Sequence, residues 1–477
     1  GPRVEHNDYD GAGNAIQGVE LHMPKMFGTD GVRGLANRDL TARLALDLGD
    51  AAVRVLGDAG TQDDQPEGRR RALVGRDTRV SGDFLASALS AVMAAGGFDV
   101  IDAGIIPTPG IAFLTSVLNV EMGAVISASH NPYAYNGIKV FNEKGYKLPD
   151  ATEAKIEEKI LSGETIPVAT RGEIGVLHHG LKQSKLEYIH HLTTTIDSDL
   201  SGLRVLVDCA NGAASATAPE LFGRFKCYAD FIHREPNGTN INDRCGSTHL
   251  ESLGQRVVAG KYDVGVAFDG DADRCLMVDE LGHEIDGDKI MAVCGAYMKR
   301  NGRLTGNTIV ATVMSNLGLH EFCRKNGIDL VCTNVGDRNV LEKMVECGYK
   351  LGGEQSGHMI FTDYATTGDG QLSALQFLQI LALSGKSASV LTADCPQYPQ
   401  VLLNVVVSHD RGVKEAIMAS DALKTAVADE EKFLRGEGRI LVRPSGTEAL
   451  IRVMVEAKTE SVAQLVAERL VKVIRSV

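Results

Sequence analysis

The sequence contains no tryptophan, and aromatic residues make up only 5% of its 477 residues. It also lacks an apolar run of about 18 residues, the length that a membrane-spanning helix needs, and no signal peptide follows Met23, so we expect neither a span nor secretion. The nine cysteines are scattered singly, no Cys-x-x-Cys pair occurs, and their number is odd. This pattern argues against a disulfide framework or a zinc site, and it predicts a reduced, cytoplasmic protein.

Basic residues are also in the minority, because 49 lysines and arginines face 62 aspartates and glutamates, for a net charge of −13. An acidic surface argues against binding to nucleic acid or to an anionic membrane, although local clusters of arginine can still hold phosphate groups. Hydrophobic residues make up 44% of the chain, which is enough for the cores of several domains.

The alternation of strand and helix patterns predicts an α/β fold class with mixed, mainly parallel sheets. Residues 72–75, 98–103 and 122–126 have the pattern of buried strands, and residues 41–56 and 81–95 that of surface helices. The same alternation recurs twice further along the chain, whereas the last 80 or so residues have the pattern of an α+β module. We therefore expect three similar α/β domains and a C-terminal α+β domain around a central cleft.

Residues 1–22 have no apolar periodicity, and we interpret them as an irregular remnant of an expression tag and linker that precedes Met23. Prolines, glycines and changes of pattern then suggest where the domains meet. The expected domains comprise residues 23–180, 181–286, 287–395 and 396–477.

Two local signals concern the first of these domains. Ser81 stands directly before a helical pattern, so we expect it to cap that helix. Pro107 and Pro109 are expected to turn the chain before the strand at residues 122–126.

The chain is organised around residues 124–141, AVISASHNPYAYNGIKVF, in which a β-branched strand runs into a polar turn. A serine hydroxyl is a poor nucleophile unless a base, a cation or a metal lies beside it. His130 follows Ser129 at once and Lys139 comes ten positions later, while Asn131 and Pro132 prevent a helix from forming across the turn. We expect the loop to expose the hydroxyl. The alternative is that Ser129 only stabilises the turn.

A second polar turn, DGDADR, follows the buried strand pattern at residues 264–268. Asp269, Asp271 and Asp273 alternate along it, so their carboxylates can point to one side and offer the oxygen ligands that Mg²⁺ prefers. An EF-hand is excluded because Arg274 stands where its loop needs glycine. Arg274 suits a phosphate that bridges to the metal, and a solvated acidic turn remains the alternative.

A third turn, RPSGTE, lies between two strand patterns near the C-terminus. Ser445, Gly446 and Thr447 can offer backbone N–H groups and hydroxyls, and Arg443 and Arg452 can offer charge. This combination is typical of an anion-binding nest, although a plain hairpin turn has the same pattern.

Three further segments are weaker signals when taken alone. In GGEQSGH, paired glycines allow a close approach of the backbone to a ligand, and Glu354 and Ser356 can bind neighbouring sugar hydroxyls. FGTDGVRG contains Arg33, and GRDTR contains Asp77, which can pair with a neighbouring arginine. Both of the latter segments can be glycine-rich loops with a structural arginine.

Taken together, the sequence resembles the α-D-phosphohexomutase superfamily, and within it the branch of the bacterial phosphoglucosamine mutases. FGTDGVRG, GRDTR, ISASHNP with NGIK, DGDADR, GGEQSGH and RPSGTE occur in the order of that family, between Met23 and Val477. One departure is Ala449, where the family usually has proline. We expect a slightly looser phosphate turn there.

The resemblance implies a heart-shaped molecule of four domains, each contributing one loop to the cleft. It implies that Ser129 is the phosphoserine and that it holds one Mg²⁺ together with Asp269, Asp271 and Asp273. The expected reaction interconverts glucosamine 6-phosphate and glucosamine 1-phosphate, on the route to UDP-N-acetylglucosamine and the cell wall. A sugar 1,6-bisphosphate is the expected intermediate and activator.

The remaining site residues follow from the same resemblance. Arg33, His130 and Lys139 are expected to assist phosphoryl and proton transfer at Ser129. The residues expected to bind the substrate are Arg274, Glu354, Ser356, His358, Arg443, Ser445, Gly446, Thr447 and Arg452.

Three rival functions remain open at this stage. One is a phosphomannomutase or phosphoglucomutase of the same superfamily, and another is a Mg²⁺-dependent sugar phosphatase in which water intercepts the phosphoserine. The third is a sugar-phosphate sensor without activity, against which the joint presence of Ser129 and the three aspartates argues. The expected partner is a small hexosamine phosphate, and a homodimer is compatible with the sequence.

Overall fold

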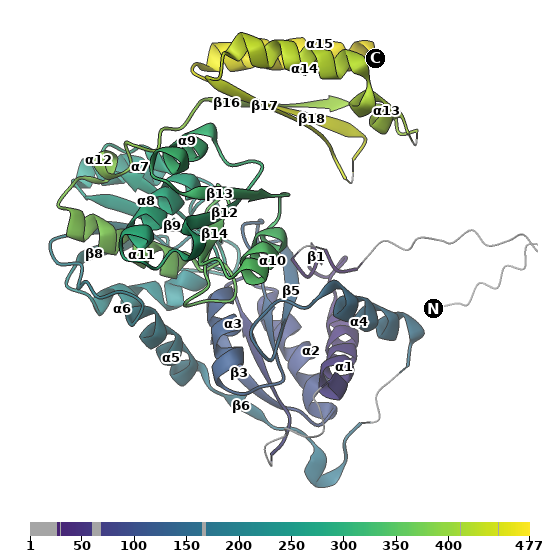
Figure 1. Cartoon of the computed structure of the whole chain (residues 1–477). Coiled ribbons are helices and arrows are strands. Elements are labelled where there is room, and N and C mark those ends of the chain that lie inside the picture. The colour runs from purple at the N-terminus through teal and green to yellow at the C-terminus, as the bar shows by residue number, and fades with distance from the viewer. Residues whose placement is uncertain (1–25, 29, 60–67, 165–167, 411, 447) are drawn as a thin grey trace, which may run out of the picture.

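A computed structural model describes residues 26–477 except 29, 60–67, 165–167, 411 and 447. The predicted remnant at residues 1–22 and the predicted phosphate ligand Thr447 therefore lie outside the described residues. Four sheets of six, five, four and three strands follow one another along the chain (Figure 1). The predicted fold class, three α/β domains followed by an α+β domain, is confirmed.

The first domain is built on a mixed six-stranded sheet with the order β1-β5-β4-β2-β3-β6. Strands β4, β2, β3 and the edge strand β6 are parallel, whereas β5 is antiparallel to both β1 and β4. Its elements are β1 (Val32–Leu35), α1 (Ala42–Ala59), β2 (Arg71–Arg76), α2 (Gly82–Ala95), β3 (Asp99–Ile105), α3 (Thr108–Val117), β4 (Met122–Ile126), β5 (Tyr135–Asn142), α4 (Asp150–Ser162) and β6 (Leu177–His179).

Helices cover both faces of this sheet, because its central strands are apolar on both sides. Leu48 and Leu89, from α1 and α2, pack on one face with Val74 of β2. Ile111 of α3 and Tyr188 of α5 (Leu181–Thr193) pack on the other.

The second domain has a five-stranded sheet with the order β11-β10-β9-β7-β8, in which β8, β7 and β9 are parallel. The carboxyl ends of these parallel strands all meet at one edge of the sheet. The elements are β7 (Arg204–Asp208), α6 (Ala218–Gly223), β8 (Tyr228–Ile232), α7 (Glu251–Gly260), β9 (Val264–Phe268), β10 (Cys275–Asp279) and β11 (Glu284–Ile285).

The third domain repeats this plan with the strand order β13-β12-β14-β15, in which only the β14–β15 pair is antiparallel. The elements are α8 (Gly287–Arg300), β12 (Thr308–Thr312), α9 (Leu317–Lys325), β13 (Asp329–Thr333), α10 (Asp337–Cys347), β14 (Leu351–Gly353), β15 (Met359–Phe361), α11 (Gly370–Ser384) and α12 (Ala388–Leu391).

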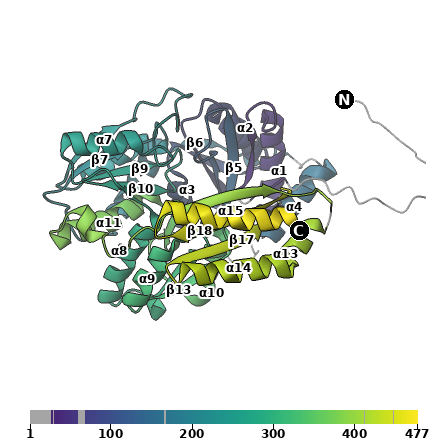
Figure 2. The same ribbon diagram turned by 90° about the horizontal axis from the view of Figure 1, so that it is seen from above.

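The C-terminal module is an antiparallel sheet with the order β16-β18-β17, covered on one face by helices. Its elements are β16 (Gln400–Val406), α13 (Val413–Ala419), α14 (Asp421–Leu434), β17 (Gly438–Pro444), β18 (Leu450–Ala457) and α15 (Glu460–Ser476). Seen from above, this module lies over the other three domains (Figure 2).

The cores of these domains differ in continuity. One cluster of buried side chains runs through the first three domains, from Tyr188 through Phe268 to Ile309. The C-terminal module has a separate core, in which Val453 packs with Leu470. The first three domains are therefore joined by apolar packing. Short 3-10 turns at Arg171–Glu173, Ala213–Ala216 and Thr305–Asn307 complete the connections.

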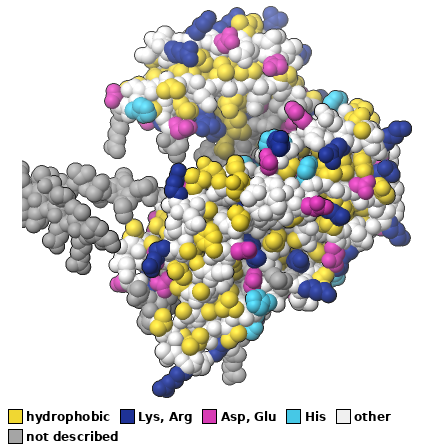
Figure 3. Space-filling view, turned by 180° about the vertical axis from the view of Figure 1, so that it is seen from behind, with side chains coloured by type: hydrophobic (Ala, Val, Ile, Leu, Met, Phe, Trp, Pro, Cys, Tyr) yellow, Lys and Arg dark blue, Asp and Glu magenta, His cyan; other side chains and the backbone are white. Residues whose placement is uncertain are grey.

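Polar contacts connect the C-terminal module to the third domain. Arg439 of β17 donates to the backbone oxygen of Val313 at 2.8 Å and to that of Ser315 at 2.5 Å. The same guanidinium pairs with the fully buried Glu456 at 3.2 Å. Glu456 in turn accepts a hydrogen bond from Leu317 N at 2.9 Å. A hollow separates much of the module from the domains below it (Figure 3).

One local prediction was correct only in position, and another was wrong. Ser81 is the N-cap residue of α2 as predicted, but it makes no side-chain cap hydrogen bond, and its hydroxyl instead accepts from Asn136 Nδ2 at 2.8 Å. Pro107 and Pro109 do not turn the chain into the next strand, since α3 begins at Thr108. Proline fits the first turn of a helix because the N–H that it lacks has no partner there.

Within the described part of the chain, no helix combines the length and the apolar character that crossing a membrane requires.

Candidate active site

Ser129 lies in the loop that follows β4, and its residue is only 1% exposed. The predicted exposure of the hydroxyl is therefore wrong, because loops of neighbouring domains close over the turn. Ser129 has a φ of +54°, in the left-handed region that non-glycine residues rarely adopt. Its backbone N–H donates to Ser127 Oγ at 2.9 Å, and its hydroxyl donates to Asp269 Oδ2 at 2.7 Å. The strained backbone thus aims the hydroxyl at the acidic loop.

Asp77 and Arg79, which follow β2, hold this loop in place through hydrogen bonds. The Arg79 guanidinium donates to Ser129 O at 3.0 Å and to Pro132 O at 2.5 Å, and it pairs with Asp77 at 2.9 Å. Asp77 also accepts from Ser127 Oγ at 2.6 Å. The expected pairing of Asp77 with an arginine neighbour is confirmed, and GRDTR here is a scaffold of the serine loop.

The three aspartates of DGDADR follow β9 and are all buried, with Asp271 fully so. One carboxylate oxygen from each lies within 4.8 Å of the others. A Cβ atom at Gly270 would lie 2.4 Å from Ser129 O, so only glycine allows the two loops to approach this closely. The structure therefore brings Ser129 and the predicted acidic triad together.

Lys139 of β5 and Thr108 of α3 both contact the middle aspartate. Lys139 Nζ lies 2.8 Å from Asp271 Oδ2 and 3.9 Å from Asp273 Oδ2, and Thr108 Oγ1 donates to Asp271 Oδ2 at 2.6 Å. Burial alone would raise the pKa of Asp271, but Lys139 holds this pKa below its ordinary value. Burial and Asp271 raise the pKa of Asp273. Burial and the two neighbouring carboxylates raise the pKa of Asp269 well above its ordinary value.

The triad fits a hard divalent cation. Asp271 Oδ1 and Asp273 Oδ1 are buried and have no hydrogen-bond partner among the described residues. Lys139 and Arg274 supply two positive charges to three crowded carboxylates, so the carboxylates remain in excess. Oxygen donors of this kind, in excess of the nearby cations, are what Mg²⁺ binds.

Arg33 and His130 lie at the edge of the serine loop. Arg33 pairs with Asp30 at 3.1 Å, and its Nε is buried without a partner among the residues described. Burial, Arg274 and Arg33 lower the pKa of His130 to about 4, so its imidazole is neutral at neutral pH. His130 is therefore not a proton donor in this state of the protein.

The third domain contributes the predicted sugar loop between β14 and β15. His358 is buried, and its Nε2 lies 3.8 Å from Asp273 and 3.6 Å from Asp337. Glu354 accepts from Gly336 N at 3.3 Å and is close enough to raise the pKa of Arg274, together with Asp273 and Asp269 and against the effect of burial. Ser356 is exposed.

Several charged residues at this junction were not predicted from the sequence. Lys147 pairs with Asp30 at 2.9 Å and also with Asp337 of α10, which links the FGTDGVRG loop to the third domain. Arg338 pairs with Glu153 across the same junction at 2.5 Å. These ion pairs become visible only in the three-dimensional structure, because the spacing of their residues in the sequence follows no motif.

The turn between β17 and β18 holds the predicted phosphate ligands. Arg443 and Arg452 lie directly opposite each other in the antiparallel register, and burial together with Arg452 lowers the pKa of Arg443. Like charges placed opposite in a sheet are destabilising unless an anion lies between them. Ser445 is buried and accepts from Glu448 N at 3.1 Å, and Gly446 is exposed.

Lys414 was not predicted, although its Nζ donates to Ser445 O at 2.6 Å and to Glu448 O at 3.2 Å. The turn thus carries positive charge from two strands and from α13. It belongs to the C-terminal module, which stands apart from the first domain (Figure 1).

The chain matches four consecutive families of phosphoglucomutase/phosphomannomutase domains. These are α/β/α domain I at residues 24–166, domain II at 186–282, domain III at 286–398 and the C-terminal domain at 402–473. The matches follow one another in the order of the four sheets.

Full-length relatives include a phosphoglucosamine mutase of Bifidobacterium longum, which is 58% identical over 461 residues, 95% of this chain and 99% of that protein. The phosphoglucosamine mutase of Rhodococcus erythropolis is 51% identical over 456 residues, which cover 95% of this chain and 100% of that protein.

Solved structures show the same fold at low identity. A phosphoglucomutase/phosphomannomutase family protein from Burkholderia thailandensis has a TM-score of 0.77 at 23% identity, covering 95% of this chain and 97% of that one. An N-acetylphosphoglucosamine mutase of Aspergillus fumigatus, in complex with GlcNAc-6P and magnesium, has a TM-score of 0.66 at 18% identity, covering 94% and 95%. With its four matched domains and its full-length relatives, the chain belongs to the phosphoglucomutase/phosphomannomutase family, among the phosphoglucosamine mutases.

Proposed function

We propose that this protein is an isomerase that interconverts glucosamine 6-phosphate and glucosamine 1-phosphate through a phosphoserine at Ser129. The observation that carries the proposal is the 2.7 Å hydrogen bond from Ser129 Oγ to Asp269, inside a buried triad of carboxylates. A serine hydroxyl held in this way is placed for phosphoryl transfer rather than for stabilising a turn.

In the proposed reaction, phosphoserine 129 transfers its phosphoryl group to the 1-hydroxyl of the 6-phosphate, and a sugar 1,6-bisphosphate forms. The bisphosphate then turns end over end, and Ser129 takes back the 6-phosphoryl group. The seryl oxygen leaves in the first half-reaction and attacks in the second, so the enzyme regains its phosphate. Added bisphosphate would act as an activator because it can phosphorylate an unmodified Ser129.

Asp269, Asp271 and Asp273 would hold one Mg²⁺ together with the phosphate on Ser129. When bound, this ion supplies positive charge to the oxygens of the transferring phosphoryl group. Arg274 follows the triad directly and carries a permanent charge, so it contributes to the same stabilisation.

Lys139 and His130 would share two proton transfers. In the first half-reaction the base takes the proton of the attacking sugar 1-hydroxyl, and the acid gives a proton to the leaving oxygen of Ser129. Burial opposes a charge on Lys139, but Asp271 and Asp30 raise the pKa of its ammonium, which therefore stays protonated and can donate. His130 is neutral at neutral pH, because its pKa is about 4, and a neutral imidazole can accept a proton. We assign the acid role to Lys139 and the base role to His130, with Arg33 oriented by Asp30 beside the phosphoryl group.

The far end of the substrate would be held by the other two domains. We assign Glu354, Ser356 and His358 to the sugar ring. Arg443 and Arg452 are assigned to the phosphate that does not react, supported by Ser445, Gly446 and Thr447. The crowding of Arg443 against Arg452 supports this assignment, because a dianion between the two strands relieves it.

The bisphosphate has to be recognised in two orientations, so we infer that the C-terminal module moves as a unit between an open and a closed position. Two features support this inference. The module has its own core, and polar contacts around Arg439 and Glu456 connect it to the third domain. The active cleft would then lie between this module and the other three domains.

We further infer a cytoplasmic location, in which the product supplies UDP-N-acetylglucosamine and cell-wall synthesis. The nine cysteines are all free, which suits a reducing compartment. The proposal allows a homodimer, and light scattering would measure the oligomeric state.

The test is a comparison of glucosamine, glucose and mannose 6-phosphates under matched conditions, with isomerised sugar and inorganic phosphate both measured. The highest kcat/KM is expected for glucosamine 6-phosphate. Preference for mannose or glucose would favour a different mutase, and release of phosphate without isomerisation would favour a phosphatase. Intact-mass analysis should show one added phosphate that is lost in Ser129→Ala.

A further inference from the structure

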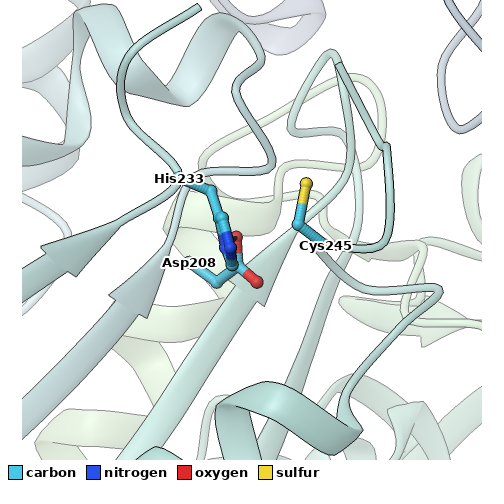
Figure 4. A group of neighbouring side chains, drawn as sticks. All are labelled: Asp208, His233 and Cys245. Atoms are coloured by element: carbon cyan, nitrogen blue, oxygen red, sulfur yellow. Dashed lines mark ion pairs between the residues drawn. The ribbon is translucent and has the colours of Figure 1, made fainter. Parts of the chain in front are cut away.

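A second cluster of ligand-type side chains lies in the second domain, outside the proposed catalytic residues (Figure 4). Asp208 ends β7, His233 follows β8, and Cys245 lies in the loop before α7. Parallel strands β7 and β8 deliver the first two residues to the same edge of the sheet. The cluster cannot be recognised in the sequence. His233 comes 25 positions after Asp208, Cys245 comes 12 positions after His233, and no Cys-x-x-Cys spacing exists.

The spacing of the ligand atoms matches that of a small coordination site. One ligand atom from each of the three residues lies within 4.8 Å of the others, and His233 Nδ1 lies 3.0 Å from Asp208 Oδ1. Nitrogen and oxygen ligands of a tetrahedral zinc ion, each bonded at about 2.1 Å, lie about 3.4 Å apart. Asp208 and His233 therefore already stand at about the spacing of two ligands, and Cys245 Sγ lies within 4.8 Å of both.

The pair of Asp208 and His233 is not aligned as a hydrogen bond, in spite of its short distance. His233 Nδ1 is buried, and the part of the chain that the structure describes offers it no hydrogen-bond partner. A buried ring nitrogen without a hydrogen bond is unfavourable, and a cation shared with Asp208 would satisfy it.

Backbone hydrogen bonds fix the carboxylate in its place. Asp208 Oδ1 accepts from Ala210 N at 2.9 Å, and Asp208 Oδ2 accepts from Gly246 N at 2.8 Å. Each oxygen keeps a lone pair for another partner. Metal-ligating carboxylates are commonly oriented by such additional bonds.

We propose that Asp208, His233 and Cys245 form a binding site for a divalent cation of the zinc class, distinct from the magnesium triad. A thiolate, an imidazole and a carboxylate together favour Zn²⁺ or Co²⁺ over Mg²⁺, which prefers oxygen ligands alone. The side chain of His233 is 25% exposed, so solvent reaches this part of the cluster.

The loop that holds Cys245 also touches the serine loop of the first domain. Asn242 Nδ2 donates to Ser129 O at 2.8 Å and to Asn131 O at 3.1 Å, while Asn242 N donates to Ala210 O at 2.9 Å. A cation between Asp208 and Cys245 would therefore brace the segment that positions the serine turn. The site would act on stability and loop order, whereas the chemistry stays with the triad.

The test uses the full-length protein, stripped with a chelator and then kept in excess Mg²⁺ so that the triad is filled. On titration with Co²⁺, we expect one equivalent to bind with a thiolate-to-cobalt absorption band, and Zn²⁺ to displace it and raise the unfolding temperature. Cys245→Ser should lose the band. His233→Ala should weaken Co²⁺ binding by at least the tenfold or so that loss of even an outer-shell partner causes.

The matched control is Cys347→Ser, which removes an exposed thiol at the end of α10. This variant should keep the band, the stoichiometry and the Zn²⁺-induced thermal shift. The proposal is overturned if the wild-type protein shows no thiolate band at one equivalent, or if the band survives Cys245→Ser and disappears in Cys347→Ser. Both results are independent of mutase activity, so they do not bear on the proposed function.

Discussion

Lys139 Nζ lies 2.8 Å from the Asp271 carboxylate, and both side chains are almost completely buried. An ion pair of this kind contributes little to net stability, because desolvation offsets most of the Coulomb attraction. Loss of one partner is far more serious, since a buried charge is then left alone. Lys139 thus neutralises the middle carboxylate and leaves the outer oxygens of the triad for a cation.

We expect Lys139→Met to destabilise the magnesium-free protein by about 3–5 kcal/mol, because the Asp271 charge is left without compensation. Bound Mg²⁺ would replace much of the missing charge. The rise in unfolding temperature on adding Mg²⁺ should therefore be larger in Lys139→Met than in the wild-type protein, even though activity falls. Differential scanning calorimetry with and without Mg²⁺ checks this, and an unchanged or smaller shift would contradict the role of the triad.

Ser129→Ala should abolish mutase activity and remove the added phosphate from the intact mass. Its effect on the free energy of unfolding should be about 1 kcal/mol, the usual contribution of one hydrogen bond. Ser127→Ala is the matched control, because Ser127 Oγ only supports the loop through Ser129 N and Asp77. This control should keep the phosphate and part of the activity. Full activity in Ser129→Ala would refute the phosphoserine assignment.

Arg452→Gln should raise KM for the sugar phosphate while making the free protein slightly more stable. The two effects have the same cause: Arg452 stands opposite Arg443, so its removal relieves repulsion of about 0.2–1 kcal/mol and also removes a proposed phosphate ligand. The pair of Arg452 with Glu448, at 3.5 Å, is largely exposed, so its loss costs little stability. Steady-state kinetics and urea unfolding measure the two changes.

Arg439→Gln provides the contrast for this prediction, because Arg439 is bound to Glu456 and to backbone oxygens of the third domain. It should lower stability by leaving the buried Glu456 without its cationic partner, although Leu317 N and Gln400 still donate to this carboxylate. A loss of stability in Arg452→Gln, or an unchanged KM, would contradict the anion-binding role of the turn.

The sequence predicted β4 and β9 and the polar turns that follow them, because both strands are apolar runs that end in polar residues. It did not predict α11, in which residues 370–381 are buried on every side. A helix without a polar face has no amphipathic period, so the pattern that reveals α1 and α2 is missing there.

The burial of Ser129 also could not be predicted from the sequence. A polar turn is exposed when considered alone, but Asn242 and Gly270 of the second domain close over this one. The cluster of Asp208, His233 and Cys245 shows the same limit, since its members meet only through the pairing of β7 with β8 and the return of a long loop. Contacts between segments distant in sequence require the tertiary structure.

The last prediction concerns Asp288, which contacts the segment of the third domain that binds Arg439 of the C-terminal module. Its carboxylate accepts from Ser315 Oγ at 2.8 Å and from Asn316 N at 2.7 Å. Burial and the neighbouring Asp286 raise the pKa of Asp288 to about 7. The carboxyl pKa in the unfolded state is about 3.9. Between about pH 4 and pH 7, the folded state therefore keeps a proton that the unfolded state has lost.

Stability from this group is consequently full below about pH 4 and is lost as the pH rises toward the folded pKa of about 7. Asp288→Asn cannot ionise, and its amide can still donate to Ser315 Oγ while its oxygen accepts from Asn316 N. The unfolding temperature of the variant should therefore fall less steeply over this pH range than that of the wild-type protein. Asp329→Asn, at an exposed carboxylate of the same domain, is the control and should keep the wild-type slope. An identical slope in Asp288→Asn would show that the proton is taken up elsewhere.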